Sequence, residues 1–188
     1  LESMLGKLKT PPTNTALQKW SSIKTPYLRQ HAVNLLLQNK QLISPVAIQA
    51  LAKEKSTRIE LYDTLKANKK QNLFPTQYRS QKSFGESLVY SSDDDNTPDS
   101  ITYLSEKTIN FKGRQSRFYF YKLEFGTGED AQHYLGCAGP FPLNATDISL
   151  KDAIGTINEN DYFDLSNLSA QKDTIIKQML EGFDWQDK

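Results

Sequence analysis

The stretch Arg117-Phe118-Tyr119-Phe120-Tyr121-Lys122-Leu123-Glu124-Phe125, RFYFYKLEF in one-letter code, decides the fold of the second half of this chain. Aromatic and aliphatic residues of this kind favour the pleated conformation of a β-strand. Neighbouring side chains of a strand point to opposite faces, so the consecutive aromatic residues place large apolar groups on both faces. We therefore predict a central strand that is covered on both sides.

Two further strand patterns flank this stretch, and a turn separates each of them from it. The pattern before it is apolar at alternate positions, namely Ile101, Tyr103, Ile109 and Phe111. Residues 112–115 and 126–130 contain glycine and polar residues typical of turns, and residues 132–137 predict a third strand that ends before Gly139. Strand, turn, strand, turn, strand is the order of an antiparallel β-meander.

The remaining signals of the second half are weaker. Leu88-Val89-Tyr90 indicates a short strand before the meander, and residues 76–84 indicate a short helix that bridges the two halves. After Pro142 the sequence is polar and rich in turn residues. Ser169 is the predicted N-cap of a last helix. The apolar face of that helix contains Ile175, Ile176, Met179 and Leu180.

The first half contains four predicted helix starts. Three of them share one form, a hydroxyl residue followed by proline: Thr10-Pro11, Thr25-Pro26 and Ser44-Pro45. A hydroxyl at the N-cap accepts an unpaired backbone N–H, and proline at the first helical position loses no hydrogen bond. The fourth start is Thr57, because Glu60 three residues later completes a capping box.

These helices form two predicted pairs, whose starts, 11 to 45 and 26 to 57, are separated by a little over thirty residues. A period of this length is typical of helical solenoids. In this pattern, residues 10–70 resemble HEAT-type repeats, in which antiparallel helix pairs stack on one another. A plain helical bundle would give the same pattern. Two pairs bury little apolar surface, so we expect either further repeats before Leu1 or a cap supplied by the second half.

The predicted fold class is therefore α+β. Residues 1–75 form antiparallel helical pairs, HEAT-like or a bundle, and residues 76–188 form a small antiparallel β-meander with a C-terminal helix. Because the chain begins at Leu1 without an initiating methionine, we expect it to be the C-terminal segment of a larger bacterial protein. The compartment, cytoplasm or bacterial envelope, stays open.

Composition limits the classes of partner. The chain has 188 residues, of which 37% are hydrophobic and 24% are charged, and its net charge is +1. This balance argues against bulk attraction to nucleic acid or to an anionic membrane. No apolar run approaches the roughly 20 residues that a membrane-spanning helix needs. We therefore expect neither nucleic acid nor a membrane span.

The acidic stretch SSDDDNTPDS, residues 91–100, is the only candidate metal site. Laid on the template of a calcium loop, its oxygen ligands would be Ser91, Asp93, Asp95 and Asp99. Two departures count against calcium, because Ser91 replaces the first aspartate and Thr102 stands where a bidentate glutamate is usual. Turn chemistry alone also explains Asp, Asn and Pro at this place. Calcium is thus the only cofactor candidate, and a solvated loop is the alternative.

The single cysteine does not make a catalytic pair with a histidine. His133 and Cys137 lie four residues apart on a predicted strand, about 13 Å from one another along the same face. We interpret Cys137 as a buried free thiol. The basic and aromatic run 114–122 could stack on single-stranded nucleic acid, but the acidic residues that follow it favour core packing.

The sequence therefore predicts no catalytic or cofactor-binding residues. We expect a non-catalytic scaffold or protein-interaction module, because stacked helical pairs expose extended surfaces that often bind proteins. Two alternatives stay open: an accessory domain that shapes the substrate site of an upstream hydrolase-type enzyme, and a surface module stabilised by calcium.

Overall fold

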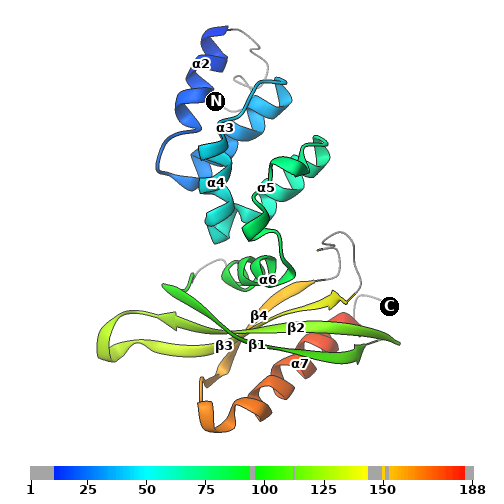
Figure 1. Cartoon of the computed structure of the whole chain (residues 1–188). Coiled ribbons are helices and arrows are strands. Elements are labelled where there is room, and N and C mark those ends of the chain that lie inside the picture. Colours follow the sequence, from blue (N-terminus) through cyan, green and yellow to red (C-terminus); the bar gives the residue numbers. More distant parts are fainter. Residues whose placement is uncertain (1–10, 94–95, 112, 144–149, 151–152, 185–188) are drawn as a thin grey trace. The chain divides into compact units, whose positions relative to one another are not determined.

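The computed structural model describes residues 11–93, 96–111, 113–143, 150 and 153–184. The chain divides into two compact units, residues 1–79 and 80–188. The predicted boundary, between residues 75 and 76, lies a few residues earlier. In the described part of the chain, the first unit is helical and the second contains a four-stranded antiparallel sheet with helices, which confirms the α+β class (Figure 1).

Four α-helices and two short 3₁₀-helices make up the described part of the first unit. They are α2 (Pro11–Trp20), α3 (Pro26–Gln38), α4 (Pro45–Lys53), α5 (Lys55–Ala67), η1 (Gln71–Leu73) and η2 (Thr76–Tyr78). Helix α2 packs on α3, α4 packs on α5, and α3 also contacts α4 and α5. The apolar faces of these helices meet in a core that includes Leu17, Ala32, Leu36, Leu51, Leu61 and Leu65.

The helix starts at Pro26 and Pro45 are confirmed, but their capping chemistry differs from the prediction. Thr25 and Ser44 are the N-cap residues of α3 and α4, yet neither hydroxyl makes a capping hydrogen bond. Thr10 lies outside the described residues. The capping box at Thr57 is wrong, because α5 already begins at Lys55. The Thr57 hydroxyl instead donates to the carbonyl of Leu51 at 2.8 Å, inside the core.

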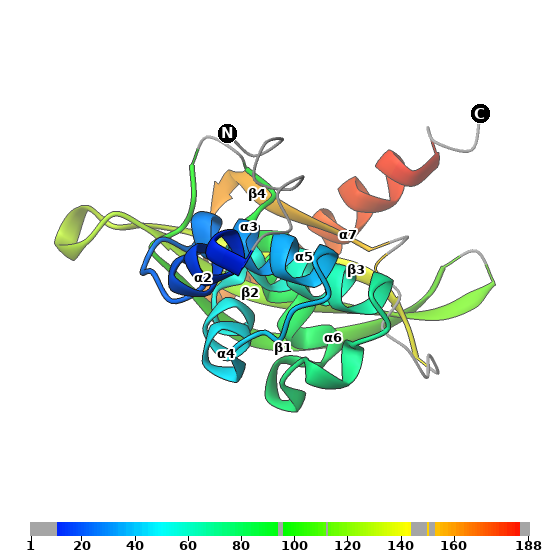
Figure 2. The same cartoon turned by 90° about the horizontal axis from the view of Figure 1, so that it is seen from above.

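The second unit is a meander between two helices. It contains α6 (Gln81–Tyr90), β1 (Ser100–Phe111), β2 (Arg114–Phe125), η3 (Gly128–Asp130), β3 (Gln132–Pro142), β4 (Ile154–Tyr162), η4 (Leu165–Asn167) and α7 (Leu168–Asp184). The strands lie side by side in the order β1-β2-β3-β4, and each pair is antiparallel. Helix α6 covers one face of the sheet and α7 covers the other (Figure 1), and Figure 2 shows the same arrangement from above.

The aromatic stretch 117–125 lies in β2, an inner strand of this sheet, as predicted. Tyr119, Tyr121 and Leu123 pack with Val89 of α6 on one face. The intervening residues Phe118 and Phe120 pack on the other face, with α7 side chains that include Ile175, Ile176 and Met179. Both faces of β2 are therefore covered by apolar side chains.

Five local predictions around this unit are wrong. Leu88-Val89-Tyr90 is the last turn of α6 and not a strand, and residues 76–84 are divided between η2 and the start of α6. Strand β3 continues through Gly139 to Pro142. Strand β4 lies where we expected turns. Helix α7 begins at Leu168, so Ser169 is its second residue and not its N-cap.

Candidate binding surface

Helices α3 and α5 of the first unit share a structural device that the sequence did not reveal. Both helices have 13 residues, so the step along the chain from Pro26 to Lys55 equals the step from Gln38 to Ala67. The fourth residue of each is an arginine that closes the preceding turn. Arg29 Nε donates to the carbonyl of Ile23 at 3.0 Å, and Arg58 Nε donates to that of Ala52 at 2.7 Å. Both bonds span six residues.

The C-terminal ends of the two helices are also alike. Each ends at an Asn followed by a lysine with positive φ, 56° at Lys40 and 57° at Lys69. The next N–H donates back to Leu36 in the first case and to Leu65 in the second, at 2.8 Å in both. This is the hydrogen bond of a left-handed helix cap, which satisfies carbonyls at the helix end. Both helices therefore enter and leave their turns in the same way.

A groove of about 340 Å³ lies between the start of α4 and the segment that follows α5. Its apolar lining consists of Ile43, Pro45, Ile48, Leu73 and Pro75. Its polar lining consists of two amides and a hydroxyl, Gln49, Gln77 and Thr76, so none of the described charged side chains lines it. The groove thus offers apolar contact and neutral hydrogen-bonding groups.

Two large aliphatic side chains that are sequence neighbours of lining residues are exposed to solvent. Leu42, next to Ile43, is 87% exposed, and Val46, next to Pro45, is 77% exposed. Leu73 of the lining is itself 44% exposed. Single exposed apolar residues are ordinary, but a cluster around a hollow is typical of a binding surface. We define Leu42, Val46 and the groove lining as the α4 groove.

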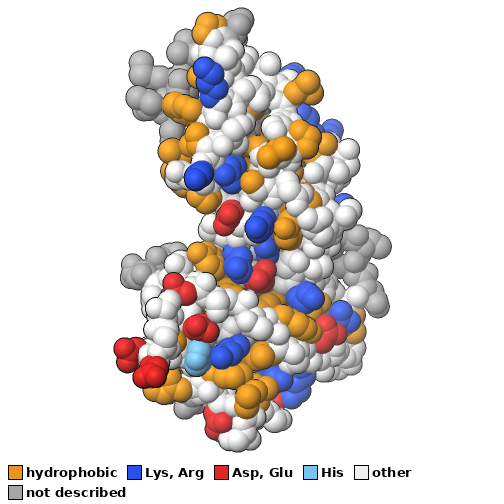
Figure 3. All heavy atoms as spheres, turned by 60° about the vertical axis from the view of Figure 1, so that its left-hand side comes forward, with side chains coloured by type: hydrophobic (Ala, Val, Ile, Leu, Met, Phe, Trp, Pro, Cys, Tyr) orange, Lys and Arg blue, Asp and Glu red, His pale blue; other side chains and the backbone are white. Residues whose placement is uncertain are grey.

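The charges of the chain are divided between the two units. Residues 1–79 contain 13 Lys and Arg against 4 Asp and Glu, a net charge of +9, whereas residues 80–188 contain 10 against 18, a net charge of −8. On the face shown in Figure 3, the helical unit carries basic and apolar side chains with little acid, and the sheet unit carries several acidic groups. Sequence reasoning missed this division because it averaged charge over the whole chain.

Several of these cations lie close in sequence to the α4 groove. Lys53 ends α4, Lys69 and Lys70 precede η1, and Arg79 follows η2. Lys53, Lys69 and Arg79 are exposed, and Lys70 is half-buried. The guanidinium of Arg79 lies over the ring of Tyr62, 5.8 Å from its centroid. The segments that form the groove therefore also carry positive charge.

The acidic residues of the first unit are few, and those that the structure describes do not line the groove. In the described range they are Glu54, Glu60 and Asp63. Glu60 accepts a hydrogen bond from Asn34 of α3 at 2.9 Å. Partial burial raises the pKa of the Asp63 carboxyl, against the opposing effect of nearby Lys66. These carboxylates belong to α5 and its N-cap, and they add no negative charge to the lining.

The predicted calcium loop connects α6 to β1, and not two strands. Ser91 is the C-cap residue of α6, and Asp95 lies outside the described residues. Asp93 accepts the backbone N–H of Asn96 at 3.3 Å, an ordinary turn interaction. Asp99 accepts the N–H of Gly126 at 2.8 Å and thereby ties the start of β1 to the end of β2.

Within the described ranges, the structure brings no three His, Cys, Asp or Glu side chains into an arrangement that could hold a metal ion. Asp95 lies outside these ranges. The calcium hypothesis for Ser91, Asp93, Asp95 and Asp99 therefore stays a prediction.

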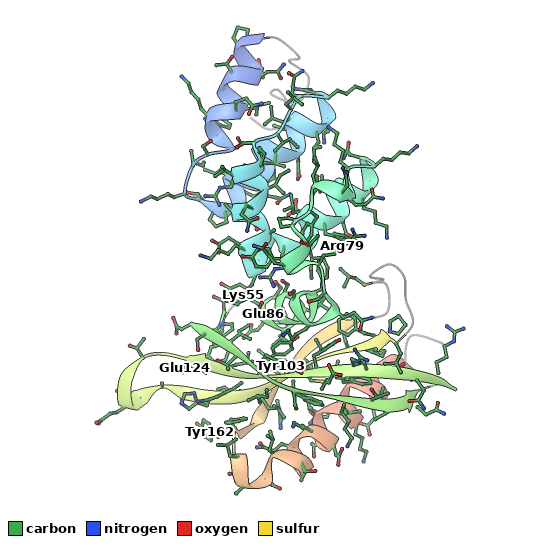
Figure 4. All side chains as sticks on the ribbon, viewed as in Figure 1. Lys55, Arg79, Glu86, Tyr103, Glu124 and Tyr162 are labelled. Atoms are coloured by element: carbon green, nitrogen blue, oxygen red, sulfur yellow. The ribbon has the colours of Figure 1, made fainter. Side chains whose placement is uncertain are left out.

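A second hollow, of about 240 Å³, lies in the sheet unit. Its lining consists of Asp93, Asn96, Phe125, Gln132, Tyr134 and Ile157. The ring of Tyr134 stacks on that of Tyr162, with centroids 5.5 Å apart, and Tyr162 at the end of β4 is 64% exposed (Figure 4). Sequence reasoning could not find this hollow, because it requires β4 beside β3.

The candidate nucleophile of the sequence is buried. Cys137 is fully buried among the apolar residues under α7, as predicted, and burial raises the pKa of its thiol. His133 lies opposite Glu124 in the sheet, with Nδ1 and a carboxylate oxygen 3.9 Å apart. A protonated, inaccessible thiol is a poor nucleophile. The pair therefore offers no covalent chemistry.

The basic and aromatic run 114–122 contributes most of its rings to the core. The Tyr121 hydroxyl donates to the carbonyl of Lys82 at 2.6 Å, and burial raises its pKa. Arg117 lies 3.5 Å from a carboxylate oxygen of Glu106. Tyr103 of β1, beside α6 in Figure 4, is covered by the ammonium of Lys82 at 4.8 Å from the ring centroid. These contacts occupy the groups that would otherwise stack on bases.

Comparison of the chain with protein-family models, with curated proteins and with solved structures gave no match. None of the helices formed by the described residues has both the length and the apolar character that crossing a bilayer requires.

Proposed function

We propose that this chain is a non-catalytic protein-interaction module, and that it binds a partner protein through the α4 groove. The observation that carries the proposal is the groove itself, a hollow with a neutral, largely apolar lining, whose lining residues Ile43 and Pro45 have the exposed Leu42 and Val46 as sequence neighbours. Protein interfaces bury apolar anchors of this kind at their centre and surround them with polar groups.

The paired devices of α3 and α5 support the proposal. The same arginine bond and the same left-handed cap recur at one regular step along the chain, which favours two copies of one helical pair over an arbitrary bundle. We extend this to a HEAT-like repeat, in which each pair presents one face to its neighbours and another to a ligand. Such arrays commonly bind proteins, and this step is an analogy of fold.

The test places a photo-crosslinking amino acid at Val46, and in a matched control at Leu165, in the intact chain in cells. Both side chains are largely exposed, 77% and 73%. We expect the position in the α4 groove to capture one protein at a reproducible segment, and the control position not to capture it.

A second arm changes the groove chemically. Val46→Asp together with Leu73→Asp should remove the captured protein from the complex, while circular dichroism shows that the helices are retained. If the double variant kept the same partner with the same affinity, the α4 groove would not be the binding surface.

A further inference from the structure

We infer that the segment bound in the α4 groove is acidic and amphipathic, with aliphatic side chains on one side and Asp or Glu beside them. This inference rests on the proposed function and adds the chemistry of the partner. It comes from two features of the helical unit: an apolar groove with a neutral lining, and an excess of cations, several of which are close in sequence to the segments that form the groove.

The apolar feature sets the first requirement. Most of the groove lining is aliphatic or proline, and Leu42 and Val46 expose further aliphatic surface next to it. A ligand that covers these side chains must supply apolar groups of its own, since polar groups would lose water there without gaining partners. One side of the bound segment is therefore apolar.

The cations set the second requirement. Lys53, Lys69 and Lys70 are in no ion pair with any residue in the described part of the chain. None of the described carboxylates lines the groove to oppose an incoming negative charge. The helical unit as a whole carries +9, so its field attracts negatively charged ligands and raises their rate of association. The other side of the bound segment is therefore acidic.

Nucleic acid has the negative charge that the cations attract, but it lacks the aliphatic groups that would cover the groove. Proteins that bind single strands stack the bases on aromatic side chains, and none of the described Phe, Tyr or Trp residues lines this hollow. Contacts to a phosphate backbone use cations and polar groups, and would leave exposed Leu42 and Val46 uncovered. An acidic amphipathic protein segment matches both features at once.

The experiment measures fluorescence anisotropy of labelled probes with the full chain. The main probe is a peptide of about 16 residues with Leu at helical spacing and Glu elsewhere. The comparison probes are the same composition in scrambled order, the same pattern with Lys in place of Glu, polyglutamate, and single-stranded and duplex DNA.

We expect the acidic amphipathic peptide to bind more tightly than every other probe. Its affinity should fall about tenfold or more in Val46→Asp, since truncating a central anchor has effects of that size. It should also fall in Lys69→Glu with Lys70→Glu, and should weaken as salt rises from about 50 to about 300 mM because salt screens the attraction. The matched controls are Leu165→Asp and Lys177→Glu, both in exposed positions of the sheet unit, and they should leave the affinity for this peptide unchanged.

Several results would overturn the inference. Tighter binding of DNA, or equal binding of the Lys peptide, would show that acidic peptide is not the preferred ligand. Equal binding of polyglutamate or of the scrambled peptide would show a general basic surface without a role for the groove. Self-association of the chain that Val46→Asp abolishes would identify a second copy as the occupant.

The failure of the inference can be told apart from the failure of the proposed function. If crosslinking at Val46 captures a basic or neutral segment, the groove binds protein but the inferred partner chemistry is wrong. If crosslinking captures nothing and no peptide binds, both are wrong.

Discussion

Gly155 fixes how closely β4 approaches α6. A Cβ atom at this position would lie 2.5 Å from the backbone nitrogen of Val89, and it would also overlap the carbonyl group of Leu88. These are backbone atoms of a helix, so they cannot move aside as a flexible side chain would. We therefore expect Gly155→Ala to lower the free energy of unfolding by about 3 kcal/mol, as overpacking of a tight contact does. Urea unfolding followed by tyrosine fluorescence measures the change.

Gly182 provides the control for that substitution. It lies in α7, and a Cβ there would meet no atom within 4 Å. Gly182→Ala should therefore raise the free energy of unfolding by roughly 0.5–1 kcal/mol, because alanine loses less conformational freedom in a helix than glycine. Equal midpoints for Gly155→Ala and the unmodified chain would show that α6 and β4 are not in this contact.

Burial of two side chains in the sheet unit predicts a loss of stability at high pH. Burial raises the pKa of the Cys137 thiol above its ordinary value of 9.0, and it raises the pKa of the Tyr121 hydroxyl above 10.0. A raised pKa in the folded state contributes stability that is complete below the ordinary value and is lost as pH rises toward the folded value. The urea midpoint should therefore be level up to about pH 8.5 and fall above about pH 9.

Cys137→Val separates the two groups. It removes the earlier part of this alkaline loss and leaves the part that comes from Tyr121. A midpoint that fell between about pH 7 and 8 in the unmodified chain would contradict the assignment to these buried groups.

At the scale of the element, the arginine near the start of α3 and of α5 holds the chain segment that leads into its helix. Arg29 donates to Ile23 in the turn after α2, and Arg58 donates to Ala52 in the last turn of α4. Arg58 is 2% exposed, and its Nη2 also donates to the carbonyl of Lys53 at 3.0 Å. Arg29 is half-buried. Replacing a buried charged donor leaves carbonyls unpaired, so we expect Arg58→Met to cost about 2–4 kcal/mol and Arg29→Met about 1–2 kcal/mol.

Thermal unfolding followed by circular dichroism at 222 nm measures both losses. Methionine keeps most of the apolar stem, so the comparison isolates the guanidinium. Equal and small losses at both positions would show that the arginines do not hold the turns.

The elements that could be predicted are those in which a local signal agrees with the tertiary environment. Proline at the first helical position located α2, α3 and α4, and the aromatic density of residues 117–125 located the central strand. The elements that could not be predicted depend on close contact. Helix α6 buries Gly85 and Ser87 together with Val89. Glycine and serine are not apolar by hydropathy, so the pattern of apolar residues does not indicate that this face of the helix is buried.

Strand β4 was missed for the same reason. Gly155 has no side chain because α6 lies against its backbone, and Asn158 is buried although it is polar. An alternating apolar pattern is therefore absent, even though the strand pairs with β3 from Ile154 to Tyr162.

At the scale of the whole molecule, the division of charge has a simple consequence for ion-exchange chromatography. A chain with net charge +1 would normally be held weakly by any resin near neutral pH. Because one unit carries +9 and the other −8, we expect this chain to be retained at low salt by both cation and anion exchangers. Lys53→Glu with Lys69→Glu and Lys70→Glu should reduce retention on the cation exchanger and should not reduce it on the anion exchanger. Passage through both columns would contradict the prediction.

The candidate binding surface also belongs to this scale. For that reason the sequence predicted a protein-interaction module but did not indicate which residues form its binding surface. The α4 groove joins residues 43–49 to residues 73–77, and no periodic pattern predicts that these segments meet. The acidic run 91–100 is conspicuous because its charges are adjacent in sequence. The cations of the helical unit are spread over the range 1–79, and only a count for each unit shows their excess.

The matching ends of α3 and α5 make the helical unit extensible. Gln41 and Lys70 occupy equivalent positions, since each follows a lysine in the left-handed conformation and each donates to a buried leucine carbonyl. A second copy of residues 41–69, spliced between Lys69 and Lys70, would therefore meet the present backbone geometry at both junctions. The helical unit could in this way be lengthened by genetic duplication, one helix pair at a time.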